Sequence, residues 1–198
     1  MSRISPLPHA GEGPEASEIV MKSALLIIDI QNALCVGQYA AYDIHAVVDR
    51  VNKVSAQARA AGAPVVLIQH EDDGPMRFGS EHWQLFERLD VQADDLRIRK
   101  TACDAFYRTG LQAMLASMGV DQLVVCGLQS EYCVDSTVRG ALAQGYPVTL
   151  ISDAHSTLDN GVLSAAQISA HHTVTLANLD SYGVRVTAVK AHHARIGA

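Results

Sequence analysis

Apolar runs and amphipathic segments alternate along most of this chain. Runs such as ALLII at 24–28 and LVVC at 123–126 have the length and composition of strands buried on both faces. The expected strands cover residues 24–28, 64–69, 95–99, 123–126, 147–152 and 173–176. Helical spacing of apolar residues predicts helices over 44–61, 110–118 and 162–170, and from Ser130 onward. This alternation predicts an α/β fold, a doubly wound parallel sheet with helices on both faces.

The stretch LVVCGLQSEYCVDSTV at 123–138 joins one of these strands to a helix and carries a candidate nucleophile. Gly127 ends the strand, and helical spacing begins after Ser130. Cys133 therefore falls in the first turn of a helix that leaves the C-terminal end of a buried strand. Free N–H groups and the helix dipole lower the pKa of a thiol at such a position, so we predict a reactive Cys133. The alternative is a buried structural thiol, which is our interpretation of Cys126.

Length and composition favour one domain with a small-molecule ligand. The chain has 198 residues, 48% of them hydrophobic, and residues 21–198 read as a single α/β domain. Residues 1–20 are rich in Pro, Gly, Ser and Glu, and we predict a disordered tail there. A net charge of −6 with scattered Lys and Arg argues against nucleic acid or an anionic membrane as the partner. No apolar run is long enough to span a bilayer. The four cysteines lack a paired CxxC spacing, which fits a reduced environment, and we predict a cytoplasmic protein.

Two charged residues stand where predicted strands end. Asp29 follows ALLII, and Lys100 follows the strand at 95–99. Each has an ordinary interpretation by itself, a turn or cap for Asp29 and a solvated sheet edge for Lys100. Together with Cys133 they supply a base, a cation and a thiol, and open α/β sheets place their ligand sites at the C-terminal ends of the strands. Lys100 follows an outer strand, so it must be carried back to reach the other two.

The long irregular segment 70–82 has the length of a lid or a pocket wall. His70 either bonds a backbone group at a strand end or lines the pocket, and Phe106 either lines the pocket or covers the core. The proposed pocket residues are Gln31, His70, Trp83, Phe106 and Tyr132, and their aromatic bias suits a planar or cyclic substrate. His70 with Asp72 or His82 has no recognised metal-ligand spacing, so no metal site is predicted.

Four motifs of the chain resemble those of the isochorismatase-like cysteine hydrolases, which include the nicotinamidases. They are LLIIDIQN at 25–32, RK at 99–100, VVCGLQSEYCVDSTVRGA from 124 and LISDAHST at 150–157. The resemblance covers essentially all of residues 22–190. It implies a three-layer α/β/α fold with six strands in the order 3-2-1-4-5-6, and assembly as a homodimer or homotetramer. It also implies a catalytic triad of Asp29, Lys100 and Cys133 and a non-proline cis peptide between Leu128 and Gln129.

The mechanism implied by this resemblance begins when Asp29 takes the thiol proton of Cys133 while Lys100 holds both anions. The thiolate attacks the carbonyl carbon of a C–N bond and forms a thioester, and backbone N–H groups near Gln129 and Cys133 receive the oxyanion. The favoured prediction is hydrolysis of a small amide, lactam or ureide without metal or other cofactor, since the Asp-x-His metal motif of nicotinamidases is missing from 70–82. The alternatives are vinyl-ether hydrolysis of isochorismate and a non-catalytic oligomeric member of the fold.

Overall fold

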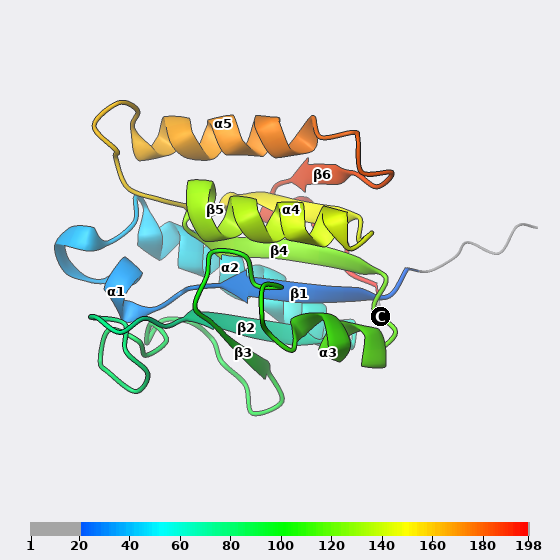
Figure 1. Ribbon diagram of the computed structural model, residues 1–198, viewed down its shortest axis with the longest axis horizontal. Helices are drawn as coiled ribbons and strands as arrows, with labels where there is room; N and C mark the ends of the chain where they lie inside the picture. Colours follow the sequence, from blue (N-terminus) through cyan, green and yellow to red (C-terminus); the bar gives the residue numbers. More distant parts are fainter. Residues whose placement is uncertain (1–20, 198) are drawn as a thin grey trace, which may run out of the picture.

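A computed structural model describes residues 21–197 and shows a six-stranded parallel sheet with the strand order β3-β2-β1-β4-β5-β6 (Figure 1). The tail predicted for residues 1–20 lies outside the described residues. The strands are β1 (Ser23–Ile28), β2 (Val65–His70), β3 (Leu96–Lys100), β4 (Gln122–Leu128), β5 (Val148–Ser156) and β6 (Val186–Val189). The α-helices are α1 (Asn32–Cys35), α2 (Ile44–Ala60), α3 (Leu111–Ser117), α4 (Asp135–Ala143) and α5 (Ala165–Ala177). Shorter helical turns are η1 (Gly37–Tyr39), the π-helical η2 (Ser130–Val134) and η3 (Ala191–His193).

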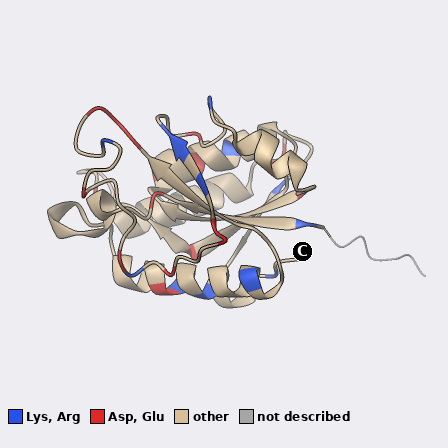
Figure 2. Cartoon of the chain, turned by 90° about the horizontal axis from the view of Figure 1, so that it is seen from below, with Lys and Arg blue, Asp and Glu red and all other residues tan. Residues whose placement is uncertain are grey.

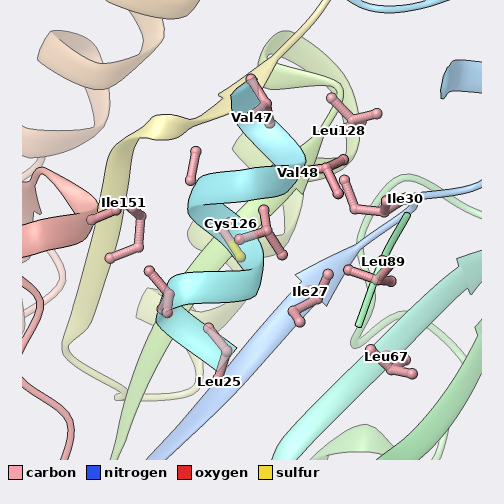
Figure 3. Close-up of a cluster of buried hydrophobic side chains, with 14 of the residues drawn as sticks. Leu25, Ile27, Ile30, Val47, Val48, Leu67, Leu89, Cys126, Leu128 and Ile151 are labelled. Carbon is pink, nitrogen blue, oxygen red and sulfur yellow. The ribbon is translucent and has the colours of Figure 1, made fainter. Parts of the chain in front are cut away.

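Two hydrophobic clusters, one on each face of the sheet, make the fold three-layered. Successive residues of a strand point to opposite faces, so Leu25 and Ile27 belong to one cluster while Leu26 and Ile28 belong to the other. Helix α2 covers the first cluster, where Val47 and its neighbours pack on β1, β2 and β4 (Figure 3). Helices α3, α4 and α5 cover the second cluster. The predicted three-layer fold and strand order are therefore confirmed.

Charged residues are kept away from the middle of this sheet. Figure 2 shows the central strands almost free of charged residues, with charge of both signs on loops and helices and positive charge on the edge strand β3, whose sequence is LRIRK. Among residues 21–197, no helix is long and apolar enough to cross a membrane.

The strand predicted at 173–176 is wrong, because these residues form the last turns of α5. The helix begins in a capping box, in which Ser164 and Gln167 satisfy each other's backbone N–H groups. It then buries Ile168 and Leu176, eight residues apart, and Leu176 joins the second hydrophobic cluster on the sheet. The β-branched run before Leu176 suggested a strand, but helix capping and tertiary packing overrode that local preference. The sixth strand is β6, which starts opposite Val148.

The ladder between β4 and β5 contains a shift in register between Val125 and Gly127. Gly127 has φ of +121°, and a Cβ atom there would lie 2.1 Å from the carbonyl oxygen of Ile28. Only glycine therefore allows β4 to approach β1 so closely. Strand β5 continues to Ser156, beyond the predicted end at 152, and its residue His155 pairs with Gly127.

Candidate active site

Lys100, Asp29 and Cys133 meet at the C-terminal ends of β3, β1 and β4. The Lys100 ammonium lies 2.7 Å from Asp29 Oδ2 and 3.1 Å from Cys133 Sγ. Lys100 is the last residue of β3 and stands in register with His70, the last residue of β2. Its long side chain reaches past β2 to Asp29, so the connection after β3 does not have to carry the residue back. The structure thus brings the three predicted residues together.

The backbone turns sharply where β1 ends. Asp29 has φ of +51°, a left-handed conformation that Asp tolerates better than most residues. Its N–H still donates to Ile68 O at 2.9 Å, while its own carbonyl accepts from Gln31 N at 2.8 Å. Asp29 is 1% exposed and Lys100 is 2% exposed, so the two charges form a buried ion pair. Such a pair is tolerated only with good geometry, and the loss of one partner leaves a costly buried charge.

The electrostatics keep Lys100 charged and Cys133 protonated. Burial opposes the ammonium, but the Asp29 carboxylate and the Cys133 sulfur together raise the pKa of Lys100 above its ordinary value. Burial and the neighbouring Asp29 carboxylate raise the pKa of the Cys133 thiol, and the opposing effect of Lys100 does not cancel them. The lowered thiol pKa predicted from the helix N-terminus is therefore wrong. Cys133 lies in the π-helical turn η2, where burial and a nearby anion outweigh the helix dipole.

Because the thiol is protonated, attack by sulfur requires a base. Asp29 Oδ1 is buried and has no hydrogen-bond partner among the described residues. One carboxylate oxygen of Asp29, one ring nitrogen of His70 and the sulfur of Cys133 all lie within 4.8 Å of one another. The Asp29 carboxylate is thus close enough to the Cys133 sulfur to accept its proton.

His70 completes the surroundings of Lys100. Its Nδ1 lies 3.3 Å from the ammonium nitrogen, which can donate three hydrogen bonds and so reaches His70, Asp29 and Cys133 at once. Burial, with the Lys100 charge second, lowers the pKa of His70, so its imidazole is neutral and Nδ1 accepts from Lys100. A role for His70 as a partner of Lys100 was not predicted. The available signal was that both residues end neighbouring strands of the expected sheet.

The remaining proposed pocket residues do not gather at one place. Gln31 is fully buried, where its Oε1 accepts from His70 N at 2.8 Å and its Nε2 donates to Trp83 O at 2.8 Å. The prediction that Gln31 lines the pocket is therefore wrong, because its amide replaces ladder hydrogen bonds where β1 turns away. Phe106 packs against the core beside Tyr146, with ring centroids 6.3 Å apart. Of the two alternatives predicted for Phe106, the structure therefore favours the one in which it covers the core. Tyr132 is 52% exposed on the turn that carries Cys133.

Trp83 lines a cavity of about 560 Å³ along the outer edge of β3. Phe78 stands edge-on to its ring at 4.8 Å, and Arg97 and Arg99 contribute positive charge to the same cavity. The cavity contacts the triad only at Lys100, whose side chain has no exposed surface. It is therefore separate from the sulfur of Cys133.

The bond between Leu128 and Gln129 is a non-proline cis peptide, as the resemblance implied. After it, Gln129 O accepts from the N–H groups of Tyr132 and Val134 at 3.2 and 3.1 Å. These bonds close the turn that holds Cys133 in front of Asp29 and Lys100.

Asp29, His70 and Cys133 also form a set of possible metal ligands. However, the Lys100 ammonium contacts all three at 2.7 to 3.3 Å, which is hydrogen-bond length. A metal such as zinc needs ligand distances of about 2.0–2.3 Å and the space that this ammonium fills. The donor set therefore fits a lysine better than a metal ion.

A protein-family model described as the isochorismatase domain matches residues 23–191. The chain belongs to the isochorismatase family. Within this family it resembles streptothricin hydrolase of Streptomyces noursei, with 41% identity over 139 residues, 69% of this chain and 50% of that protein. It spans only 50% and 59% of the two streptothricin hydrolases it matches.

Solved structures of the isochorismatase family agree with this fold. A crystal structure of an isochorismatase family protein has 41% identity and a TM-score of 0.79, covering 85% of this chain and 98% of that one. N-carbamoylsarcosine amidase from Thermoplasma acidophilum has 25% identity and a TM-score of 0.72, covering 88% of this chain and 99% of that one. The family resemblance read from the sequence is thus confirmed.

Proposed function

We propose that this isochorismatase-family chain is a cysteine-dependent hydrolase that cleaves a C–N bond of a small amide, lactam or ureide. The observation that carries the proposal is the Lys100 ammonium between the Asp29 carboxylate and the Cys133 sulfur, at 2.7 and 3.1 Å. The names of the related streptothricin hydrolase and N-carbamoylsarcosine amidase support hydrolysis of amide-type bonds.

The first step is proton transfer from the Cys133 thiol to the free oxygen of Asp29. Lys100, Asp29 and Cys133 carry one positive and one negative charge before this transfer and the same after it. Because the site is buried, a step that keeps the total charge constant avoids the large cost of creating a new isolated ion. Lys100 holds the negative charge on either atom, so the same ammonium serves both states.

The thiolate then attacks the carbonyl carbon, and the carbonyl oxygen takes the electron pair. Backbone N–H groups of the turn at 129–133 receive this oxyanion, and one well-placed donor contributes about 3 kcal/mol in other hydrolases. The C–N bond breaks as Asp29 returns its proton to the leaving nitrogen, which yields an amine or ammonia and a thioester on Cys133. Asp29 next takes a proton from water, and the hydroxide attacks the thioester carbonyl. As the C–S bond breaks, Asp29 returns this proton to the sulfur, so the carboxylic acid leaves and the Cys133 thiol is restored.

The test is a panel of small amides, lactams and ureides assayed for release of amine or ammonia, with and without a chelator. We expect turnover of at least one class that a chelator does not reduce and that Cys133→Ala abolishes. Cys103→Ser is the matched control, because Cys103 is a free, exposed thiol on the connection after β3. Turnover that persists in Cys133→Ala would contradict the proposal.

The panel also includes isochorismate. Activity on isochorismate that survives Cys133→Ala but not Asp29→Asn would favour vinyl-ether hydrolysis, which needs the acid and not the thiol. Absence of turnover with every compound of the panel would favour a non-catalytic protein.

A further inference from the structure

A closed ring of hydrogen bonds lies behind the turn that carries Cys133. Ser130 is the first residue of that turn, and His155 lies near the end of β5; they are 0% and 3% exposed. Ser130 Oγ is 2.8 Å from His155 Nδ1 and 2.9 Å from Ser169 Oγ of α5. His155 Nε2 is 2.9 Å from Thr173 Oγ1, one turn further along the same helix. The ring therefore connects the nucleophile turn to β5 and α5.

The direction of each hydrogen bond in this ring can be deduced. Thr173 Oγ1 donates its single proton to the Ser169 carbonyl at 2.8 Å, so toward His155 it can only accept. His155 consequently carries its proton on Nε2, and Nδ1 accepts the hydroxyl proton of Ser130. Ser130 has then used its only proton, and Ser169 must donate to it. The ring starts at the Ser169 hydroxyl and returns to the Ser169 carbonyl, with every donor used once.

This arrangement has one protonation state. Burial lowers the pKa of His155 to about 4, which keeps the ring neutral and Nδ1 free to accept. A fully satisfied buried polar network holds its members rigidly. The Ser130 hydroxyl is therefore held in one orientation.

A second side-chain contact holds the same turn to β5. Glu131 Oε1 accepts from the hydroxyl of Thr157, which is fully buried just after β5, at 2.8 Å. Two successive residues of the turn, Ser130 and Glu131, are thus fixed to the strand that pairs with β4. Nothing in the proposed chemistry uses either side chain directly.

We propose that Ser130 is a positioning residue, which His155 locks so that the following turn holds the Cys133 sulfur against Asp29 and Lys100. This inference rests on the proposed function, in which the sulfur must reach both partners. The contacts at 2.7 to 3.3 Å around Lys100 leave little tolerance for movement of the turn. Misplacement of a reacting group by about 1 Å can reduce a rate about a hundredfold.

The experiment compares Ser130→Ala and Thr173→Val, which break the ring at different points, with Thr173→Ser, which keeps the hydroxyl. The exposed His171, outside the ring, supplies the control His171→Asn. Turnover is expressed per folded protein, with the folded fraction taken from urea unfolding, so loss of folded material does not count. We expect Ser130→Ala and Thr173→Val to lower kcat about ten- to hundredfold with KM within about twofold, and Thr173→Ser to restore most of kcat.

A kcat per folded protein equal to that of the wild type in both Ser130→Ala and Thr173→Val would overturn the positioning role. If the wild type hydrolyses nothing in the panel, the proposed function fails, and the rate of Cys133 labelling by iodoacetamide becomes the deciding measurement. A labelling rate that changes in Ser130→Ala and Thr173→Val but not in Thr173→Ser supports positioning even then. Equal labelling rates in all of these variants would reject it.

Discussion

Removal of the Lys100 charge should lower both kcat and the free energy of unfolding, for different physical reasons. At an effective dielectric constant of about 20, a unit charge 3.1 Å from the Cys133 sulfur contributes about 5 kcal/mol to a thiolate. The same charge, 2.7 Å from Asp29 Oδ2, contributes about 6 kcal/mol to the carboxylate before the proton transfer. Because Lys100 stabilises both states by similar amounts, the loss of kcat in Lys100→Met, which keeps the length of the chain, should come from misplacement of Asp29 and Cys133 and be about a hundredfold. The same change leaves the Asp29 carboxylate buried without its partner, which costs about 3–5 kcal/mol of folding stability.

A double-mutant cycle distinguishes these two effects. Asp29→Asn alone leaves a buried ammonium unpaired, so it too should destabilise the protein by several kcal/mol. In the double variant Asp29→Asn/Lys100→Met neither charge remains, and we expect it to regain at least about 2 kcal/mol over either single variant. Activity should stay abolished, because both the base and the cation are gone.

The assays are urea unfolding for the free energy and release of amine or ammonia for kcat. Arg88→Met is the matched control: its ion pair with Asp49 is 2.9 Å long, but both side chains are about half exposed, at 42% and 55%. Loss of such a surface pair costs less than about 1 kcal/mol. If the double variant lost the sum of the two single losses, the buried pair would not be coupled and the electrostatic account of the site would be wrong.

Three further predictions concern stability. Burial lowers the pKa of His155 to about 4, so its imidazole binds a proton more readily in the unfolded chain than in the folded protein. Folding stability should therefore fall as the pH falls from about 6.5, and the loss should reach about 3 kcal/mol at pH 4. Urea unfolding across that range should show a shallower loss in His155→Asn, and an identical pH dependence would contradict this. Gly127→Ala should lower folding stability by more than about 3 kcal/mol, because the new Cβ would lie 2.1 Å from Ile28 O. The control is Gly119→Ala, where φ is +66° and a Cβ would have no atom within 4 Å. In thermal unfolding this control should lose only about 1 kcal/mol of stability. Ser164→Ala, which removes the capping box of α5, should lower stability by about 1 kcal/mol in the same measurement, and no change would show that tertiary packing alone fixes the start of that helix.

Local sequence signals were sufficient for most elements of this fold, because burial on one or both faces leaves a readable period. The run ALLII predicted β1, and the spacing of apolar residues after Asp43 predicted α2 to within one residue of its end. The β-branched residues before Leu176 misled the same reasoning, because helix α5 depends on a cap at Ser164 and on packing against the sheet. Elements whose state depends on remote contacts were therefore the ones that could not be predicted.

The sequence by itself determined which side chains stand at the C-terminal ends of the strands, among them Asp29, Lys100 and Cys133. Only the tertiary structure decided that the Lys100 side chain reaches across β2 and that the thiol pKa rises instead of falling. It also decided that Gln31 supports the backbone and that His155 faces Ser130. The physical reason is that periodicity along a chain records which face is buried, whereas charge, desolvation and hydrogen-bond direction depend on atoms that residues far apart in the sequence bring together.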